Sequence, residues 1–263
     1  MEFTTSEIAS WVGAFVYPLM RVGAAALAAP VFGNNMVPTQ VRIFLGVALT
    51  IAVLPAVGQP PPVDPLSIDG LLIALQEVVI GLTIGFILAL ALNTVVVAGE
   101  SIALAMGLGF ATMVDPQTGM SVPVISQILL VVTTLMFLAI GGHLMIVQLL
   151  ADSFTVIPVG EFQIDRDMFW GVAAWGTQMY AGAVLIALPV VTVLLVINLS
   201  LGVMTRAAPQ MNVFSVGLPL TILVGGVLLP ILVLPVLPLR MEAMWAEAYR
   251  TIGELLGVTP IGG

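Results

Sequence analysis

Two long apolar runs set the strongest limit on how this chain can fold. They cover residues 71–106 and 168–204. At about 1.5 Å of rise per residue, a helix of either length extends roughly 50 Å, whereas the hydrocarbon core of a bilayer is about 30 Å thick. Tilting a helix absorbs only part of such a difference. We therefore expect two membrane helices that continue beyond the bilayer into other protein.

Few charged residues are available to coat a water-exposed surface. Asp, Glu, Lys and Arg make up 8% of the 263 residues, and hydrophobic residues make up 60%. A soluble domain carries roughly a quarter charged residues. The composition therefore predicts an all-α membrane protein. Further apolar segments at residues 11–31, 41–57, 124–150 and 213–237 raise the expected total to about six long, kinked helices arranged in hairpins.

The charge balance and the missing residue types exclude several kinds of function. The chain has six Arg, no Lys and 14 acidic residues, for a net charge of −8, whereas binding to nucleic acid requires a basic surface. It has no Cys and one His, so a metal site would depend on scattered carboxylates. We expect membrane lipid around the chain, and no nucleic-acid partner, metal, cofactor or enzymatic activity.

The basic residues set the expected orientation in the membrane. Arg42 and Arg206 lie at the connections after the first and fifth apolar segments, whereas the connections after the second and fourth segments are mainly acidic. The positive-inside rule then places Arg42 and Arg206 on the cytoplasmic side. Gln210 and Asn212 belong to the same turn as Arg206, and both chain termini are expected on the opposite side.

Two charged residues stand inside apolar segments. Arg21 lies in the middle of the first segment, and Glu77 enters the third from the same side of the membrane. Because an unpaired charge in lipid is costly, we expect the two to form a buried pair. His143 lies at a similar depth in the fourth segment. One interpretation is a proton or ion relay built from these three residues, and the other is a structural pair that fixes helix packing.

One connection differs from an ordinary solvent loop. The segment GLGFATMVDPQTGMSVP, residues 107–123, has one charged residue between two apolar segments. Gly107, Gly109 and Gly119 free the backbone, DPQTG resembles a tight turn, and Phe110 and Met113 are bulky. Irregular backbone at membrane depth must be buried or line a cavity. One hypothesis is therefore a re-entrant plug on glycine hinges, and the other is a plain connecting loop.

Four stretches taken together resemble the FliR family of flagellar export-gate proteins. They are GLGFATMVDPQTG, FGNNMVPTQVRIFLGVALTI with its N-x-x-x-P-x-x-x-R turn, the connector PPPVDPLS, and TRAAPQMNVFSVGLPLTI. The resemblance runs over essentially the whole chain. The last hairpin also resembles FliQ, a small two-helix partner whose Q-x-N turn is matched here by Gln210 and Asn212.

The resemblance implies a single FliR-type domain that is divided into three parts. These are a FliP-like part at residues 1–167 with a plug loop at 107–122, a FliQ-like hairpin at 168–238, and an amphipathic tail at 239–263. The subunit would pack with FliP and FliQ into a helical export gate in the bacterial inner membrane, at the flagellar basal body and partly raised toward the periplasm. Gly107, Gly109, Phe110 and Met113 would then belong to the plug, and Asp115, Pro116 and Gln117 to its turn.

The resemblance also implies what the gate handles and contacts. Unfolded flagellar proteins would pass through it, the turn at residues 206–212 would face FlhB, and FlhA would be a further export component. The alternative is a self-contained small-molecule or ion transporter that uses Arg21, Glu77 and His143. A gate subunit would depend on FliP and FliQ for stability, whereas a transporter would be stable and active alone.

Overall fold

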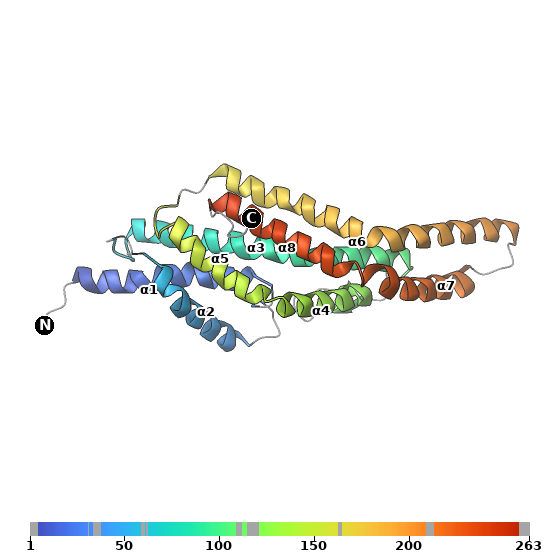
Figure 1. Ribbon diagram of the computed structural model, residues 1–263, viewed down its shortest axis with the longest axis horizontal. Helices are drawn as coiled ribbons and strands as arrows, with labels where there is room; N and C mark the ends of the chain where they lie inside the picture. The colour runs from blue at the N-terminus through green and yellow to red at the C-terminus, as the bar shows by residue number, and fades with distance from the viewer. Residues whose placement is uncertain are drawn as a thin grey trace. The chain divides into compact units, whose positions relative to one another are not determined.

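The computed structural model describes residues 5–30, 32–33, 38–58, 61, 63–108, 112–114, 121–162, 165–208 and 213–257. These residues are mainly helical (Figure 1). The helices are α1 (Thr5–Ala28), α2 (Thr39–Val53), α3 (Ile68–Ala105), α4 (Val124–Ala139), α5 (Gly142–Val156), α6 (Arg166–Ala207), α7 (Val213–Leu228) and α8 (Leu237–Leu256). Short helical turns η1 (Leu54–Ala56) and η2 (Leu229–Val233) follow α2 and α7, and strands β1 (Thr112–Val114) and β2 (Ser121–Pro123) lie between α3 and α4.

The chain forms two compact units, each assembled from segments that are separated in sequence. Unit 1 contains Met1–Leu90, Phe137–Trp175 and Ala246–Gly263, and unit 2 contains Ala91–Met136 and Gly176–Trp245. The helices α3, α4, α6 and α8 therefore contribute residues to both units. The division into FliP-like and FliQ-like parts rests on sequence resemblance alone, and it stays a prediction.

In unit 1, α3 packs closely against α1 through two glycines in the sequence GLTIG. A Cβ atom at Gly81 would lie 2.1 Å from the carbonyl oxygen of Arg21, and one at Gly85 would lie 2.6 Å from that of Ala25. Such small-xxx-small spacing lets helix backbones approach each other in membrane proteins. In the same unit, α1 and α2 lie side by side (Figure 1).

In unit 2, the C-terminal half of α3 packs against α4 and α7. A Cβ atom at Gly99 would lie 2.5 Å from the Cα of Ser126 in α4, and one at Gly225 in α7 would lie 2.6 Å from the Cγ of Met106. The hydroxyl of Ser126 donates a hydrogen bond of 3.0 Å to the carbonyl of Val96. These contacts hold the helices that flank the loop after α3.

The fold confirms the all-α membrane class, with several long apolar helices. Of the described helices, four are long and apolar enough to cross a membrane, namely Thr39–Ala56, Ile68–Ala105, Arg166–Ala207 and Ser215–Val233. In α1, Val12–Ala28 forms a shorter apolar helical stretch.

The fourth predicted segment is a broken helix. The chain passes from α4 to α5 through Gly141, which has a φ of +76°, a conformation that glycine adopts without steric cost. The pair α4 and α5 counts as a fifth span only if both are taken together. In the sequence, the two adjacent glycines of AIGGH indicate this break.

The proline-rich sixth segment and the tail are also resolved into separate elements. α7 is followed by the π-helical turn η2 at Leu229–Val233, which contains Pro230. Because proline has no backbone N–H, it cannot donate the regular α-helical hydrogen bond at this point. α8 is amphipathic. Its buried side chains recur every three or four residues and include Met241, Trp245, Ala248, Ile252 and Leu256. This face therefore packs within the chain and is not left free for the bilayer surface.

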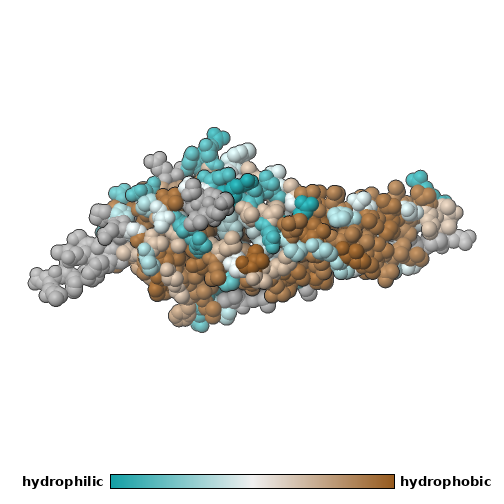
Figure 2. Space-filling model, viewed as in Figure 1, coloured by the Kyte–Doolittle hydropathy of each residue, from teal (hydrophilic) through white to brown (hydrophobic). Residues whose placement is uncertain are grey.

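Much of the surface of α6 and α7 is apolar. Figure 2 shows hydrophobic side chains gathered over the region of Figure 1 where α7 and the second half of α6 run. The exposed large side chains there include Leu195, Leu199 and Val203 of α6 and Leu223 and Val227 of α7. Water is a poor solvent for such a surface, so lipid or other protein must cover it.

Candidate functional site

The predicted plug segment contains a small β-hairpin in unit 2. Strands β1 and β2 pair antiparallel, with Thr112 opposite Pro123, Met113 opposite Val122 and Val114 opposite Ser121. The pairing places Val114 and Ser121, the last described residue of β1 and the first of β2, opposite each other. This part of the segment is therefore a paired ribbon between α3 and α4.

The N-terminal end of the segment is fastened to the hairpin of α6 and α7. Asn198 Nδ2 of α6 donates 3.0 Å to the carbonyl of Ala105. The Thr221 hydroxyl of α7 is shared between the carbonyl of Met106 at 2.9 Å and that of Leu218, in its own helix, at 3.0 Å. Ala105 is the last residue of α3 and Met106 follows it, so neither carbonyl has a partner within the helix. Thr221 is 4% exposed, so its hydrogen bond is shielded from water.

Gly107 begins the segment immediately after these anchored carbonyls. Its φ is +81°, in the left-handed region where a side chain is strained. A Cβ atom there would meet Leu218 of α7 at 3.8 Å, an ordinary contact, so the backbone conformation and not crowding requires glycine. Gly107 therefore follows directly on carbonyls that are held by α6 and α7.

The structure describes some of the predicted plug residues and not others. Gly107 lies at the end of α3 and Met113 lies in β1. The other members fall outside the described residues; they are Gly109, Phe110, Asp115, Pro116, Gln117 and Gly119. At the predicted cytoplasmic turns, Arg206 is exposed in the last turn of α6 and Arg42 lies in the first turn of α2, while Gln210 and Asn212 also fall outside.

The structure brings Arg21 and Glu77 together in the core of unit 1. Arg21 Nε donates 2.7 Å to Glu77 Oε2, and Arg21 Nη2 donates 3.1 Å to Glu77 Oε1. This is the bidentate geometry that favours Arg over Lys. Both side chains are fully buried. The backbone N–H of Gly160 also donates to the Glu77 carboxylate.

The remaining donors of Arg21 reach the C-terminal end of α5. Nη1 donates to the carbonyl of Ser153 at 2.9 Å and to its hydroxyl at 3.2 Å, and Nη2 donates to the carbonyl of Ile157 at 3.0 Å. The guanidinium also stacks 4.0 Å from the ring centre of Phe154. A guanidinium has five N–H donors, and here each has an acceptor. Arg21 therefore ties α1 to α3 and α5, with no donor left for a ligand.

His143 does not join this cluster. It stands near the start of α5, ten residues before Ser153, which corresponds to about 15 Å along a helix. The Nδ1 atom of His143 has no hydrogen-bond partner among the described residues. The three-residue relay is therefore not assembled. Within the described ranges, no group of three His, Cys, Asp or Glu side chains is placed to hold a metal ion.

Sequence reasoning missed several residues that shape these sites. Gly81 and Gly85 were readable as a small-xxx-small pair in α3. Asn198 and Thr221 gave no local signal, because their role depends on where α6 and α7 lie relative to the end of α3.

Long apolar helices, a buried ion pair and a non-helical segment between two helices define an all-α integral membrane protein. The chain matches the family described as bacterial export proteins, family 1, over residues 12–248, and it belongs to that family. The resemblance to FliR is confirmed by relatives that cover nearly the whole chain.

Three of these relatives are each named flagellar biosynthetic protein FliR. The one from Pectobacterium carotovorum subsp. carotovorum is 36% identical over 257 residues, covering 97% of each chain. The one from Escherichia coli K12 is 33% identical over 261 residues, covering 99% of each chain. The one from Aquifex aeolicus is 34% identical over 254 residues, covering 95% of each chain.

Proposed function

We propose that this chain is a non-enzymatic subunit of a flagellar type III export gate, in which it forms a channel with FliP-type and FliQ-type subunits. The observation that carries the proposal is membership of the export family over residues 12–248, together with relatives named for flagellar biosynthesis. The gate would sit in the inner membrane at the flagellar basal body, in contact with FlhB-type and FlhA-type components. Unfolded flagellar proteins would pass through it.

The over-long helices support a role inside a larger assembly. α3 has 38 residues and α6 has 42, so at about 1.5 Å per residue they extend roughly 57 and 63 Å, about twice the bilayer core. In the most apolar window of α6, 28% of the residues are buried within the chain. The apolar surface beyond the bilayer needs other protein to cover it.

The segment at residues 107–122 is the part that we assign to the closed pore. Its base is anchored by Asn198 and Thr221, and its first residue, Gly107, has a left-handed backbone conformation. A plug must be held firmly when closed and be able to move when a substrate passes. Bulky side chains at Phe110 and Met113 would obstruct ions, and rotation at Gly107 would carry them aside.

Co-purification tests the assembly. A tagged full-length chain, expressed with and without candidate FliP-type and FliQ-type subunits from the same genome, is expected to give a monodisperse detergent-stable complex only with them. A well-behaved protein without them, which exchanges ions or small solutes in vesicles, would support the transporter instead.

Ion leakage tests the plug separately. The double variant Phe110→Ala and Met113→Ala should raise the conductance of the closed, assembled gate and leave subunit composition unchanged. Leu66→Ala is a matched control, since Leu66 is 89% exposed in another connection. Unchanged conductance in an intact complex would remove the plug role and leave the gate assignment standing.

A further inference from the structure

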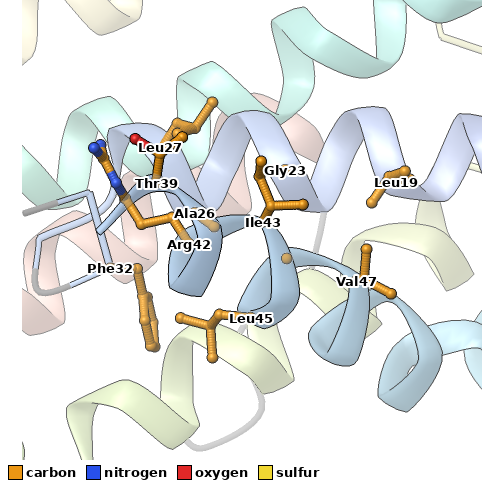
Figure 3. Close-up of a pocket in the computed structure, with 11 residues that line it drawn as sticks. Leu19, Gly23, Ala26, Leu27, Phe32, Thr39, Arg42, Ile43, Leu45 and Val47 are labelled. Atoms are coloured by element: carbon orange, nitrogen blue, oxygen red, sulfur yellow. The ribbon is translucent and has the colours of Figure 1, made fainter. Parts of the chain in front are cut away.

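Unit 1 contains an apolar cavity between α1 and α2. Its volume is about 320 Å³. The walls include Leu19, Gly23 and Leu27 of α1, Phe32 after it, and Ile43 and Gly46 of α2 (Figure 3). A Cβ atom at Gly23 or Gly46 would meet nothing within 4 Å. The space therefore exists because both facing helices carry glycine where a larger side chain would fit.

One end of this cavity is cationic. Arg42 lines it, and its Nε atom is buried without a hydrogen-bond partner among the described residues. In Figure 3 the nitrogen atoms of Arg42 lie on the side of Leu27 and Thr39, away from Leu19 and Val47. α2 begins beside this end with no side-chain cap and no acidic residue in its first turn. The cavity thus has an apolar body and one positive end, where Arg42 Nε has no partner among the described residues.

We propose that the cavity binds one anionic phospholipid, with part of an acyl chain between α1 and α2 and the headgroup phosphodiester against Arg42. A guanidinium matches the geometry of phosphate oxygens and donates to them through charge-assisted hydrogen bonds. This site goes beyond the proposed export role and does not depend on it.

The size and charge of the surroundings favour a lipid over a protein segment. The volume lies at the lower end of the range of about 300–1,000 Å³ typical of ligand sites, which suits part of one acyl chain better than a packed protein segment. The chain as a whole carries a net charge of −8. General electrostatic attraction therefore cannot retain an anionic lipid, so selective retention requires a local cation such as Arg42.

Native mass spectrometry of the full-length chain in detergent tests the site. The probes are dioleoyl phosphatidylglycerol and dioleoyl phosphatidylcholine, which share acyl chains and differ in net charge. We expect the wild-type chain to retain one phosphatidylglycerol with roughly fivefold preference, the size of effect given by one partly exposed charge-assisted contact. Arg42→Gln should abolish the preference, and Gly46→Leu should remove binding of both lipids by filling the space.

Matched variants separate the site from lipid that coats the whole protein. Arg240→Gln removes an exposed positive charge elsewhere, and Gly202→Leu places the same side chain on α6, where a Cβ atom meets nothing within 4 Å. Both should retain lipid as the wild type does. Gly23→Leu repeats the filling from the opposite wall if Gly46→Leu does not fold. Equal retention of the two lipids by the wild type, or an unchanged preference in Arg42→Gln, would overturn the proposal.

Discussion

Arg21 and Glu77 show how a buried charge can be tolerated in an apolar fold. Every N–H of the guanidinium has an acceptor, and those acceptors come from α3, α5 and the residue after α5. The sequence was sufficient to predict the Arg21–Glu77 pair, because each residue is costly alone in its segment. It was not sufficient to predict the carbonyls of Ser153 and Ile157, since backbone acceptors carry no sequence signature.

Glu77→Gln should destabilise the protein strongly. The amide keeps the shape of the carboxylate but leaves the Arg21 charge buried without a counter-charge, which costs about 3–5 kcal/mol in comparable buried pairs. The measurement is the melting temperature of the purified chain, or of its complex, together with its accumulation in membranes.

Two comparisons make the Glu77 result interpretable. Glu247→Gln breaks the exposed ion pair with Arg250 and should leave the melting temperature unchanged. Arg21→Met combined with Glu77→Leu removes both charges and should recover much of the lost stability. A Glu77→Gln variant that melts with the wild type would contradict the structural role of the pair.

Among the elements, the contact of α1 with α3 rests on the absence of side chains. Gly85→Leu is expected to destabilise unit 1 by about 1–3 kcal/mol, because overpacking forces two backbones apart. The Cβ atom alone would lie 2.6 Å from the carbonyl oxygen of Ala25. Thermal unfolding measures the loss. Gly176→Leu serves as the control, since a Cβ atom at Gly176 meets nothing within 4 Å. Equal melting temperatures for the two variants would refute the close packing.

The anchoring of the plug segment to α7 gives a second prediction among the elements. Thr221→Val keeps the size of the side chain but removes the hydroxyl that donates to Met106, a loss of about 1 kcal/mol. On the proposed function, the closed gate should leak more ions while its subunits stay together, and single-channel recording measures this. Thr192→Val is the control, because that hydroxyl donates to Leu188 in its own helix. A leak of the same size in both variants would argue against the anchor.

The elements also show where sequence reasoning was limited. Residues 68–105 and 166–207 were predicted almost to their ends, because long apolar runs leave few alternatives to helix. The separation of α4 from α5 was missed, since a hydropathy average does not register two adjacent glycines. The pairing of β1 with β2 was missed as well, because three-residue strands have too few positions to show alternation.

For the molecule as a whole, neither compact unit corresponds to a continuous piece of chain. Unit 2 needs residues 91–136 as well as 176–245, and unit 1 needs the C-terminal end of α8. Apolar patterning predicted the helices but could not predict this grouping, which depends on contacts between residues far apart in sequence. The expectation of FliP-type and FliQ-type partners came from family resemblance. An apolar surface indicates that something must cover it, but it does not identify the partner.

The register of β1 and β2 makes the plug segment open to covalent control. Facing Cα atoms in antiparallel strands are about 4.5–5.5 Å apart, within the range that a disulfide spans. Met113 and Val122 face each other, and the chain has no native Cys to compete. On the proposed function, we expect oxidation of the double variant Met113→Cys and Val122→Cys to leave export of a flagellar substrate intact, since the cross-linked hairpin would still move as one piece about Gly107. If oxidation instead stops export and a reductant restores it, β1 and β2 must separate before the channel can open.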